Sequence, residues 1–335
     1  ATDIAAAAGN VDANTPAGGN DVQAGQTQAD EGARAAALGA AAAPEGVDQP
    51  TGTPASPTPY SGKRERPMAV LIDNANGYPQ SGLLEASSIF EMPVEGGLTR
   101  LMTVYDEVDP AQVGPIRSAR TYFVEAAQDL NAVLVHDGGA PGAIAAIERS
   151  RTPTFNAYSF GVLFVRADSR SAPYNLYSSG EILRQAVNRL DLGRVRDVSG
   201  RVFRPNEDSA TANSLSVNYS SVYTSGFRYE SATNLYRWQR QGQPASDANG
   251  QAVLVDAVVV AHIDAHAIPG DTEGRLYIPL DGGDATLFLR GHAIQGQWSL
   301  DGGFGFVTDD GKSVDLTPFK HWILFTPQYA EVTTQ

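Results

Sequence analysis

Short, continuous apolar runs that end at turn residues constrain the fold of this chain more than any other feature. Residues 68–72 run Met-Ala-Val-Leu-Ile before Asp73, and residues 132–136 run Ala-Val-Leu-Val-His before Asp137. An apolar run of this length that is closed by turn residues is typical of a buried strand. Further strands are predicted over 88–92 and 98–105, and helices over 119–130, 142–149 and 180–189. The sequence therefore predicts an α/β or α+β domain with a mixed sheet and flanking helices.

Composition divides the chain into three parts. Residues 1–63 are rich in Ala, Gly and Pro, and we expect a disordered tether because such a segment buries too little apolar surface to offset its ordering entropy. Residues 64–205 hold the predicted α/β domain. Residues 206–330 alternate short strand-like segments with turn sequences such as Asp-Gly-Gly, which predicts a mostly β second domain.

Charge and composition argue against several functional classes. The chain has 24 Lys and Arg against 38 Asp and Glu, a net charge of −14, whereas general binding to nucleic acid needs a basic surface. Cysteine is absent, so disulfides, thiolate catalysis and cysteine-ligated metals are excluded. No apolar run is long enough to span a bilayer. Ala1 does not begin a signal-peptide pattern, so the chain is expected to be either cytoplasmic or already processed.

Arginines among glycine-rich turns form the main candidate site. Arg100 ends a Glu-Gly-Gly-Leu-Thr-Arg segment, and Arg117 and Arg120 lie in Gly-Pro-Ile-Arg-Ser-Ala-Arg at a predicted loop-to-helix junction. A guanidinium group can hold a carboxylate or phosphate with two bonds, and a helix N-terminus also favours anions. These residues predict an arginine-lined groove for an anion. The alternative is internal ion pairing with Asp73, Glu91 or Glu95.

Other polar residues allow weaker hypotheses. Asp73, Glu91 and Glu95 could hold a divalent cation, although an aspartate after a strand more often caps a turn. His136 could act as a general acid or base, or be structural. His262, Asp264 and His266 alternate, so on one strand they would share a face and could bind a metal. The candidate ligand-binding residues are Asp73, Asn74, Glu91, Glu95, Arg100, Arg117, Ser118, Arg120, His136, Arg170 and Asn175. No cofactor, metal site or catalytic residue is assigned.

Four segments form a recognisable set: Arg-Pro-Met-Ala-Val-Leu-Ile-Asp-Asn at 66–74, Gly-Pro-Ile-Arg-Ser-Ala-Arg at 114–120, His-Asp-Gly-Gly at 136–139 and Arg-Ser-Ala-Pro-Tyr-Asn-Leu-Tyr at 170–177. Together they resemble the YerB-like family of bacterial envelope lipoproteins. The resemblance covers about residues 64–326 and implies an exported, two-domain protein that is anchored by lipid. It also implies an envelope partner such as a penicillin-binding protein. Tyr174 and Ala245 stand where the family often has His, which weighs against an enzyme.

The leading hypothesis is a non-catalytic, extracytoplasmic lipoprotein head at the cell surface. It would bind an envelope protein or an anionic wall precursor, with no nucleic acid and no membrane contact beyond the lipid anchor. One alternative is an envelope enzyme that acts on a phosphate-containing or glycan substrate. Another is a structural surface protein that assembles with itself or its neighbours. A binding head should expose an aromatic patch, for which Tyr122, Tyr174 and Tyr177 are the candidates.

Overall fold

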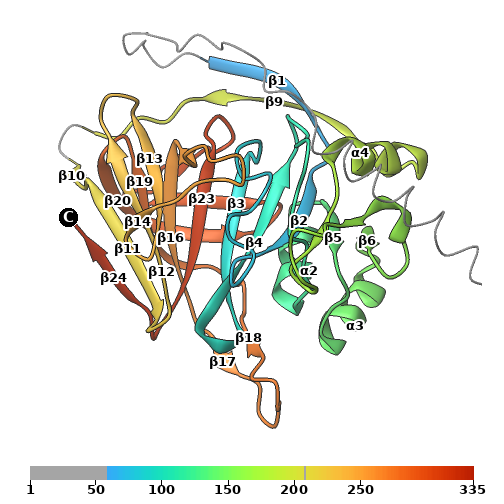
Figure 1. The fold of residues 1–335 in the computed structure, drawn as a ribbon. Helices are drawn as coiled ribbons and strands as arrows, with labels where there is room; N and C mark the ends of the chain where they lie inside the picture. The colour runs from blue at the N-terminus through green and yellow to red at the C-terminus, as the bar shows by residue number, and fades with distance from the viewer. Residues whose placement is uncertain (1–58, 207–208) are drawn as a thin grey trace, which may run out of the picture. The chain divides into compact units, whose positions relative to one another are not determined.

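The computed structural model describes residues 59–206 and 209–335, and most of the predicted tether lies outside these residues. Residues 59–63, the end of that tether, instead belong to strand β1 (Pro59–Glu65). β1 pairs along its whole length with β9 (Val195–Arg201) in an antiparallel two-stranded ribbon (Figure 1). None of the helices in the described part is long and apolar enough to cross a membrane.

A 12-stranded sheet is the centre of the described residues, and both halves of the chain build it. Most of its strands follow the order β22-β21-β20-β19-β16-β23-β3-β4-β2-β5-β6, and β10 pairs with β20. The first half supplies β2 (Met68–Asp73), β3 (Ser88–Val94), β4 (Leu98–Tyr105), β5 (Val133–His136) and β6 (Thr154–Asn156). The second half supplies β10 (Ala210–Thr211), β16 (Ala257–Ile263), β19 (Gly283–Leu289), β20 (His292–Leu300), β21 (Phe304–Thr308), β22 (Ser313–Val314) and β23 (His321–Pro327). The two halves join where β23 pairs in parallel with β3.

A second sheet, of six strands, covers one face of the large sheet. Its strands are β11 (Ser214–Ser220), β12 (Tyr223–Glu230), β13 (Leu235–Arg240), β14 (Gln243–Pro244), β15 (Leu254–Val255) and β24 (Glu331–Thr334). Phe227 and Trp238 of this sheet lie in one apolar core with Ile89 and Trp322 of the large sheet. The large sheet is therefore buried on both faces here, which is why β2 and β3 are continuous buried runs.

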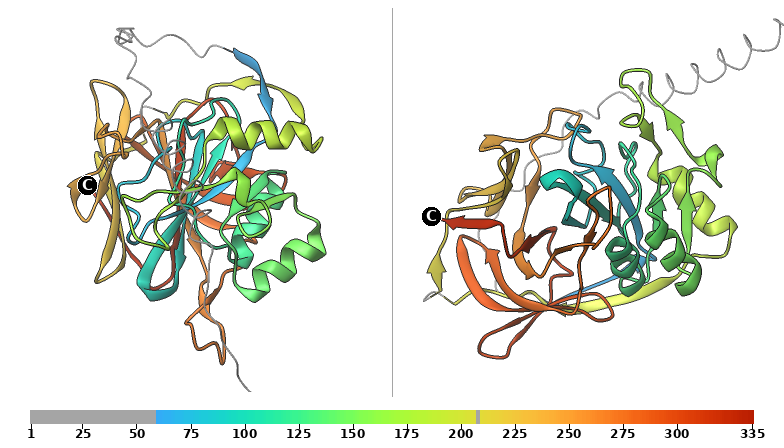
Figure 2. Two further views of the ribbon diagram at one scale, coloured as in Figure 1. Left: turned by 45° about the vertical axis from the view of Figure 1, so that its right-hand side comes forward. Right: turned by 90° about the horizontal axis from the view of Figure 1, so that it is seen from below.

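Three helices cover the β2–β5–β6 end of the large sheet, away from the small sheet (Figures 1 and 2). They are α2 (Thr121–Asp129), α3 (Pro141–Ser150) and α4 (Gly180–Arg189). α2 and α3 pack into the core on one face of the sheet, and α4 packs into the core on the other. The Ser179 side chain caps α4 by accepting the Ile182 N–H at 3.2 Å. The predicted class, a mixed sheet with flanking helices followed by a mostly β part, is confirmed.

Short elements complete the described fold. They are η1 (Glu95–Gly97), η2 (Gly161–Leu163), β7 (Val165–Arg166), β8 (Leu176–Tyr177), β17 (His266–Ala267) and β18 (Leu276–Tyr277). β7 pairs with β8, and β17 pairs with β18. The β7–β8 segment lies beside loop 113–116, because the Ile116 N–H donates to the Leu176 carbonyl and Val113 pairs with Ser178.

Candidate functional site

The predicted arginines gather at the carboxyl edge of the parallel strands β2, β5 and β6. Ligands of α/β sheets commonly bind outside this edge. The loop 114–120 extends the sheet there, because the Arg117 N–H donates to the Leu71 carbonyl at 2.9 Å and the Arg117 carbonyl accepts the Asp137 N–H at 3.1 Å. The same loop continues to Ala119, whose N–H donates to the Gly138 carbonyl at 2.9 Å. The loop therefore fixes its side chains between the ends of β2 and β5.

Arg100 is a buried cation without a carboxylate partner. It faces Asp73 across the β2–β4 register, and only 5% of the residue is exposed. One guanidinium nitrogen, Nη1, donates to the Ser118 carbonyl, whereas Nε is buried without a hydrogen bond. Within the described residues, no carboxylate oxygen lies within 4.0 Å of this guanidinium. Burial, and then the neighbouring charge of Arg120, lowers the pKa of Arg100 to about 10, so the group stays protonated at neutral pH.

The other two arginines form ion pairs with two of the three carboxylates that the sequence suggested as internal partners. Arg120 donates to both oxygens of Glu95, with Nε 2.5 Å from Oε1 and Nη2 2.9 Å from Oε2. Although burial opposes the shift, these bonds hold the pKa of Glu95 below its usual value. Arg117 places Nε 3.2 Å from Oδ2 of Asp73. Three guanidinium groups thus meet two carboxylates, and the excess positive charge falls on Arg100.

Two helix N-termini add partial positive charge at the same edge. α2 begins directly after Arg120, and α3 begins at Pro141. Neither helix has a side-chain cap or an acidic residue in its first turn. They begin close together because the Ala119 carbonyl accepts the Ala140 N–H at 3.1 Å. Uncapped N–H groups at a helix start favour an anion, which reinforces the charge of Arg100.

His136 lies at the end of β5 and has no exposed surface. Its Nδ1 is 2.6 Å from the Gly138 carbonyl oxygen, so Nδ1 carries the proton, and Nε2 is buried without a partner. Burial lowers the pKa of His136, which keeps the imidazole neutral. The side chain of Ser118, beside it, makes no hydrogen bond with this ring in the described part of the chain. The geometry therefore provides no serine–histidine pair for nucleophilic catalysis.

Glu91 and Asn74 lie apart from the arginines, against the small sheet. The Glu91 carboxylate is fully buried and accepts hydrogen bonds from Asn74, Thr99, Tyr223, Ser225 and Trp322. Burial raises the pKa of Glu91. The Asn74 side-chain carbonyl accepts a hydrogen bond from Gln80 at 2.7 Å. These two predicted site residues therefore join the two halves of the protein and do not face the carboxyl edge.

The structure does not bring Asp73, Glu91 and Glu95 together as ligands of one divalent cation. Each carboxylate faces its own donors, and Oδ1 of Asp73 accepts the N–H groups of residues 75–77 at 2.9, 2.7 and 2.6 Å. Among the described residues, no group of three His, Cys, Asp or Glu could hold a metal. This includes His262, Asp264 and His266, because β16 ends at Ile263 and His266 belongs to β17. Of the three, Asp264 and His266 form an exposed pair, with Oδ2 and Nε2 2.9 Å apart.

Arg170 and Asn175 lie in the segment between β7 and β8. This segment borders the arginine cluster, which consists of Arg100, Arg117 and Arg120. Arg170 donates to the carbonyls of Gly77 at 2.5 Å and Pro79 at 2.8 Å, and Asn175 accepts from Arg166 at 3.0 Å. The Arg117 guanidinium lies over the Tyr174 ring, 5.0 Å from its centroid. A surface depression of about 410 Å³ borders this contact, lined by Asn76, Tyr78, Arg170, Ser171 and Tyr174.

Sequence reasoning identified Arg170 but not Asn76, Tyr78 or Ser171 of this depression. The turn after the first buried strand was a signal for Asn76, because short polar side chains at strand ends commonly line sites. The prediction that Tyr122, Tyr174 and Tyr177 form an exposed aromatic patch is wrong for two of these residues. Tyr122 and Tyr177 are 2% and 7% exposed, and only Tyr174 is partly exposed.

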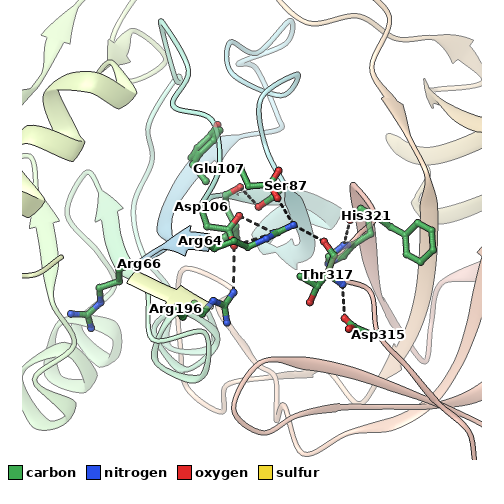
Figure 3. Close-up of polar contacts among 12 residues, drawn as sticks. Arg64, Arg66, Ser87, Asp106, Glu107, Arg196, Asp315, Thr317 and His321 are labelled. Carbon is green, nitrogen blue, oxygen red and sulfur yellow. Dashed lines mark hydrogen bonds and ion pairs between the residues drawn. The ribbon is translucent and has the colours of Figure 1, made fainter. Parts of the chain in front are cut away.

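A second polar cluster lies at the opposite end of β4 and β2 (Figure 3). Its centre is the buried Asp106, which accepts hydrogen bonds from Arg64 of β1 and Arg196 of β9. Arg64 also donates to the Thr317 carbonyl at 2.6 Å and contacts Glu107. Arg64 and Arg196 both form ion pairs with Asp106, so this cluster anchors the ribbon.

Comparisons with known proteins support one family. Residues 50–193 match the N-terminal domain model described as "Protein of unknown function (DUF3048)", and residues 215–323 match its C-terminal domain model. A Bacillus subtilis (strain 168) relative named "Putative lipoprotein YerB" is 30% identical over 272 residues, which cover 78% of this chain and 81% of that protein. The crystal structure of YerB protein from Bacillus subtilis has a TM-score of 0.71 and 29% identity, and the match covers 81% of this chain and 94% of that one. The chain therefore belongs to the YerB-like family, which is built from the two DUF3048 domains.

Proposed function

We propose that this chain is the extracytoplasmic head of a lipid-anchored envelope protein, and that it binds an anionic wall ligand as a non-catalytic scaffold or regulator. The name of the relative, "Putative lipoprotein YerB", supports this location. The observation that carries the binding activity is Arg100, a buried guanidinium without a carboxylate partner in the described residues.

Leaving a buried charge unpaired is costly, so proteins normally pair such a group or use it to bind an ion. After burial, the charges of Arg120 and Arg117 lower the pKa of Arg100, and the charge of Asp73 opposes them only in part. An oxyanion would supply the missing negative charge and could also accept hydrogen bonds from the start of α2. Because only 5% of Arg100 is exposed, a small phosphate or carboxylate group fits this site better than the flat surface of a protein partner.

The proposal favours binding over catalysis. His136 is neutral and bonded to a backbone carbonyl, and Asp73 is occupied by three backbone N–H groups and Arg117. Neither group is therefore free to transfer a proton. An envelope protein such as a penicillin-binding protein could still be the partner, if it presents a carboxylate or phosphate to the same guanidinium group.

The test is isothermal titration of the full chain with inorganic phosphate at low ionic strength. We expect saturable binding that Arg100→Met weakens by about tenfold or more, because one charge-assisted contact contributes roughly this much. Arg228→Met is the matched control, since Arg228 is exposed on the small sheet. Arg100→Met should also keep the wild-type melting temperature. Unchanged phosphate affinity in folded Arg100→Met would contradict the proposal, and a large loss of stability would favour a structural role.

A further inference from the structure

The depression beside the arginine cluster is built from two separate loops. Asn76 and Tyr78 belong to the segment after β2, and Arg170, Ser171 and Tyr174 belong to the segment between β7 and β8. Its volume of about 410 Å³ falls in the range of small-molecule sites. Arg117 connects it to the anion site, because this guanidinium contacts both the Tyr174 ring and the Asp73 carboxylate.

Contacts within the protein hold both loops in place without a ligand. Arg170 bridges them by donating to the Gly77 and Pro79 carbonyls. The Tyr78 hydroxyl accepts the Ser246 N–H at 3.2 Å, and its ring packs edge-on against Trp238 with centroids 6.1 Å apart. On the other side, Arg117 donates to the Pro173 carbonyl at 3.3 Å. The depression is therefore largely preformed, which reduces the entropy that a ligand must overcome.

The lining has the chemistry of a sugar site. Tyrosine rings can pack against the C–H groups of a pyranose, whereas the side chains of Asn76, Ser171 and Arg170 can hydrogen-bond to its hydroxyls. None of the five lining residues is aliphatic, so a lipid chain would gain little by entering. Within the described residues, Arg170 forms no ion pair, and its guanidinium donates to the carbonyl oxygens of Gly77 and Pro79. This leaves the depression without a negative group that would repel a phosphorylated ligand.

We infer that this depression is a saccharide subsite and that the ligand is a phosphorylated sugar. The sugar ring occupies the depression, and its phosphate lies toward Arg117 and Arg100. This inference rests on the proposed anion site and specifies the class of ligand that the site takes. It assigns Tyr174 and Asn76 to recognition of the sugar, separately from the arginines that recognise charge.

The test compares three probes on the full chain by isothermal titration: inorganic phosphate, N-acetylglucosamine and N-acetylglucosamine 1-phosphate. The sugar phosphate is expected to bind at least about tenfold more tightly than inorganic phosphate. Tyr174→Ala and Asn76→Ala should each lose most of this advantage, and their affinity for inorganic phosphate should stay within about twofold of wild type. Tyr174→Phe keeps the ring and should retain the advantage.

Tyr277→Ala is the matched control, because Tyr277 is a 59% exposed tyrosine on β18. Asn76 is exposed, so Asn76→Ala tests the subsite even if Tyr174→Ala fails to fold. Equal affinity for phosphate and sugar phosphate, or an advantage that survives in both alanine variants, would overturn the saccharide inference and leave the anion site standing. If the wild-type chain binds no phosphate at all, the proposed function fails and the inference fails with it.

Discussion

Lys320 is a buried lysine whose pKa is determined by its surroundings in the folded protein. Its ammonium group donates to the carbonyls of Leu83 and Leu84 at 2.8 and 2.7 Å, close to Glu85, Asp247 and Asp256. Burial lowers its pKa from 10.5 to about 8, although the three carboxylates oppose the shift. The folded state therefore releases this proton at a lower pH than the unfolded chain does.

This shift predicts a pH dependence of stability. Between pH 8 and pH 10.5 the unfolded chain holds the Lys320 proton and the folded protein does not, so raising the pH favours folding through this group. The contribution is complete above pH 10.5 and is lost as the pH falls through 8. Urea unfolding from pH 7 to 11 should show that wild type gains stability relative to Lys320→Arg, which keeps donors but does not titrate in this range. Parallel curves for the two proteins would contradict the shift.

At the same scale, the sequence predicted that the three arginines gather at one sheet edge better than it predicted which carboxylates they pair with. Arg100, Arg117 and Arg120 do lie together, because turns and a helix start place them at one sheet edge. Which arginine stays unpaired depends on the β2–β4 register and on the path of loop 114–120. Neither the register nor the loop path can be read from residue spacing along the chain. Glu91 and Asn74 were therefore predicted to lie in the groove, although their side chains point to the small sheet.

At the scale of elements, the β1–β9 ribbon is held by side-chain contacts more than by burial. None of the seven residues of β9 is buried, and Ser and Gly occur in both strands. The ribbon is fixed instead through Arg64, whose guanidinium donates to both oxygens of Asp106 at 3.1 and 3.2 Å (Figure 3). Arg66 fixes the next segment by donating to the Asn131 carbonyl at 2.8 Å. Because neither β1 nor β9 has apolar periodicity, neither strand could be predicted from sequence.

Arg64→Ala should therefore release the ribbon without unfolding the sheet. We expect the amides of 60–65 and 195–201 to exchange hydrogen at least about tenfold faster, because their local opening no longer breaks the Asp106 contacts. The loss in global stability should be about 1–3 kcal/mol, from leaving the Asp106 carboxylate with fewer partners. Lys63→Ala is the control, since Lys63 is exposed on the same strand. Exchange in the ribbon that stays at wild-type rates would show that Arg64 does not hold it.

Apolar strands and amphipathic helices were predicted well because local pattern and burial agree there. The predicted ranges 98–105 and 180–189 coincide with β4 and α4. β24 and the short strands at sheet edges were missed, because their pairing is decided by distant partners. β11, for example, lies between β12 and β24, and more than 110 residues separate Val217 from its partner Val332.

At the scale of the whole molecule, the two halves of the sequence share one sheet and one buried polar network. β23 pairs in parallel with β3, so the last part of the chain returns to the middle of the first. Glu91 of β3 accepts from Trp322 at 2.8 Å, from Ser225 at 2.9 Å and from Tyr223 at 2.7 Å, all in the second half. Separating the halves would leave this carboxylate buried without its donors or expose the core around it. No local sequence pattern predicts contacts at such separations.

The shared sheet predicts that residues 59–335 unfold in one cooperative transition. Calorimetry should give equal calorimetric and van't Hoff enthalpies, which is the criterion for two-state unfolding. The fragments 59–205 and 206–335, expressed separately, should each lack near-ultraviolet circular dichroism, because each exposes one side of the β3–β23 junction. Mixing them should restore signal if the pairing is sufficient for assembly. Two resolved transitions, or one fragment that folds alone with dispersed amide resonances, would contradict this prediction. The boundary near residue 205 would then separate independent domains, and the β3–β23 junction would be an interface between them.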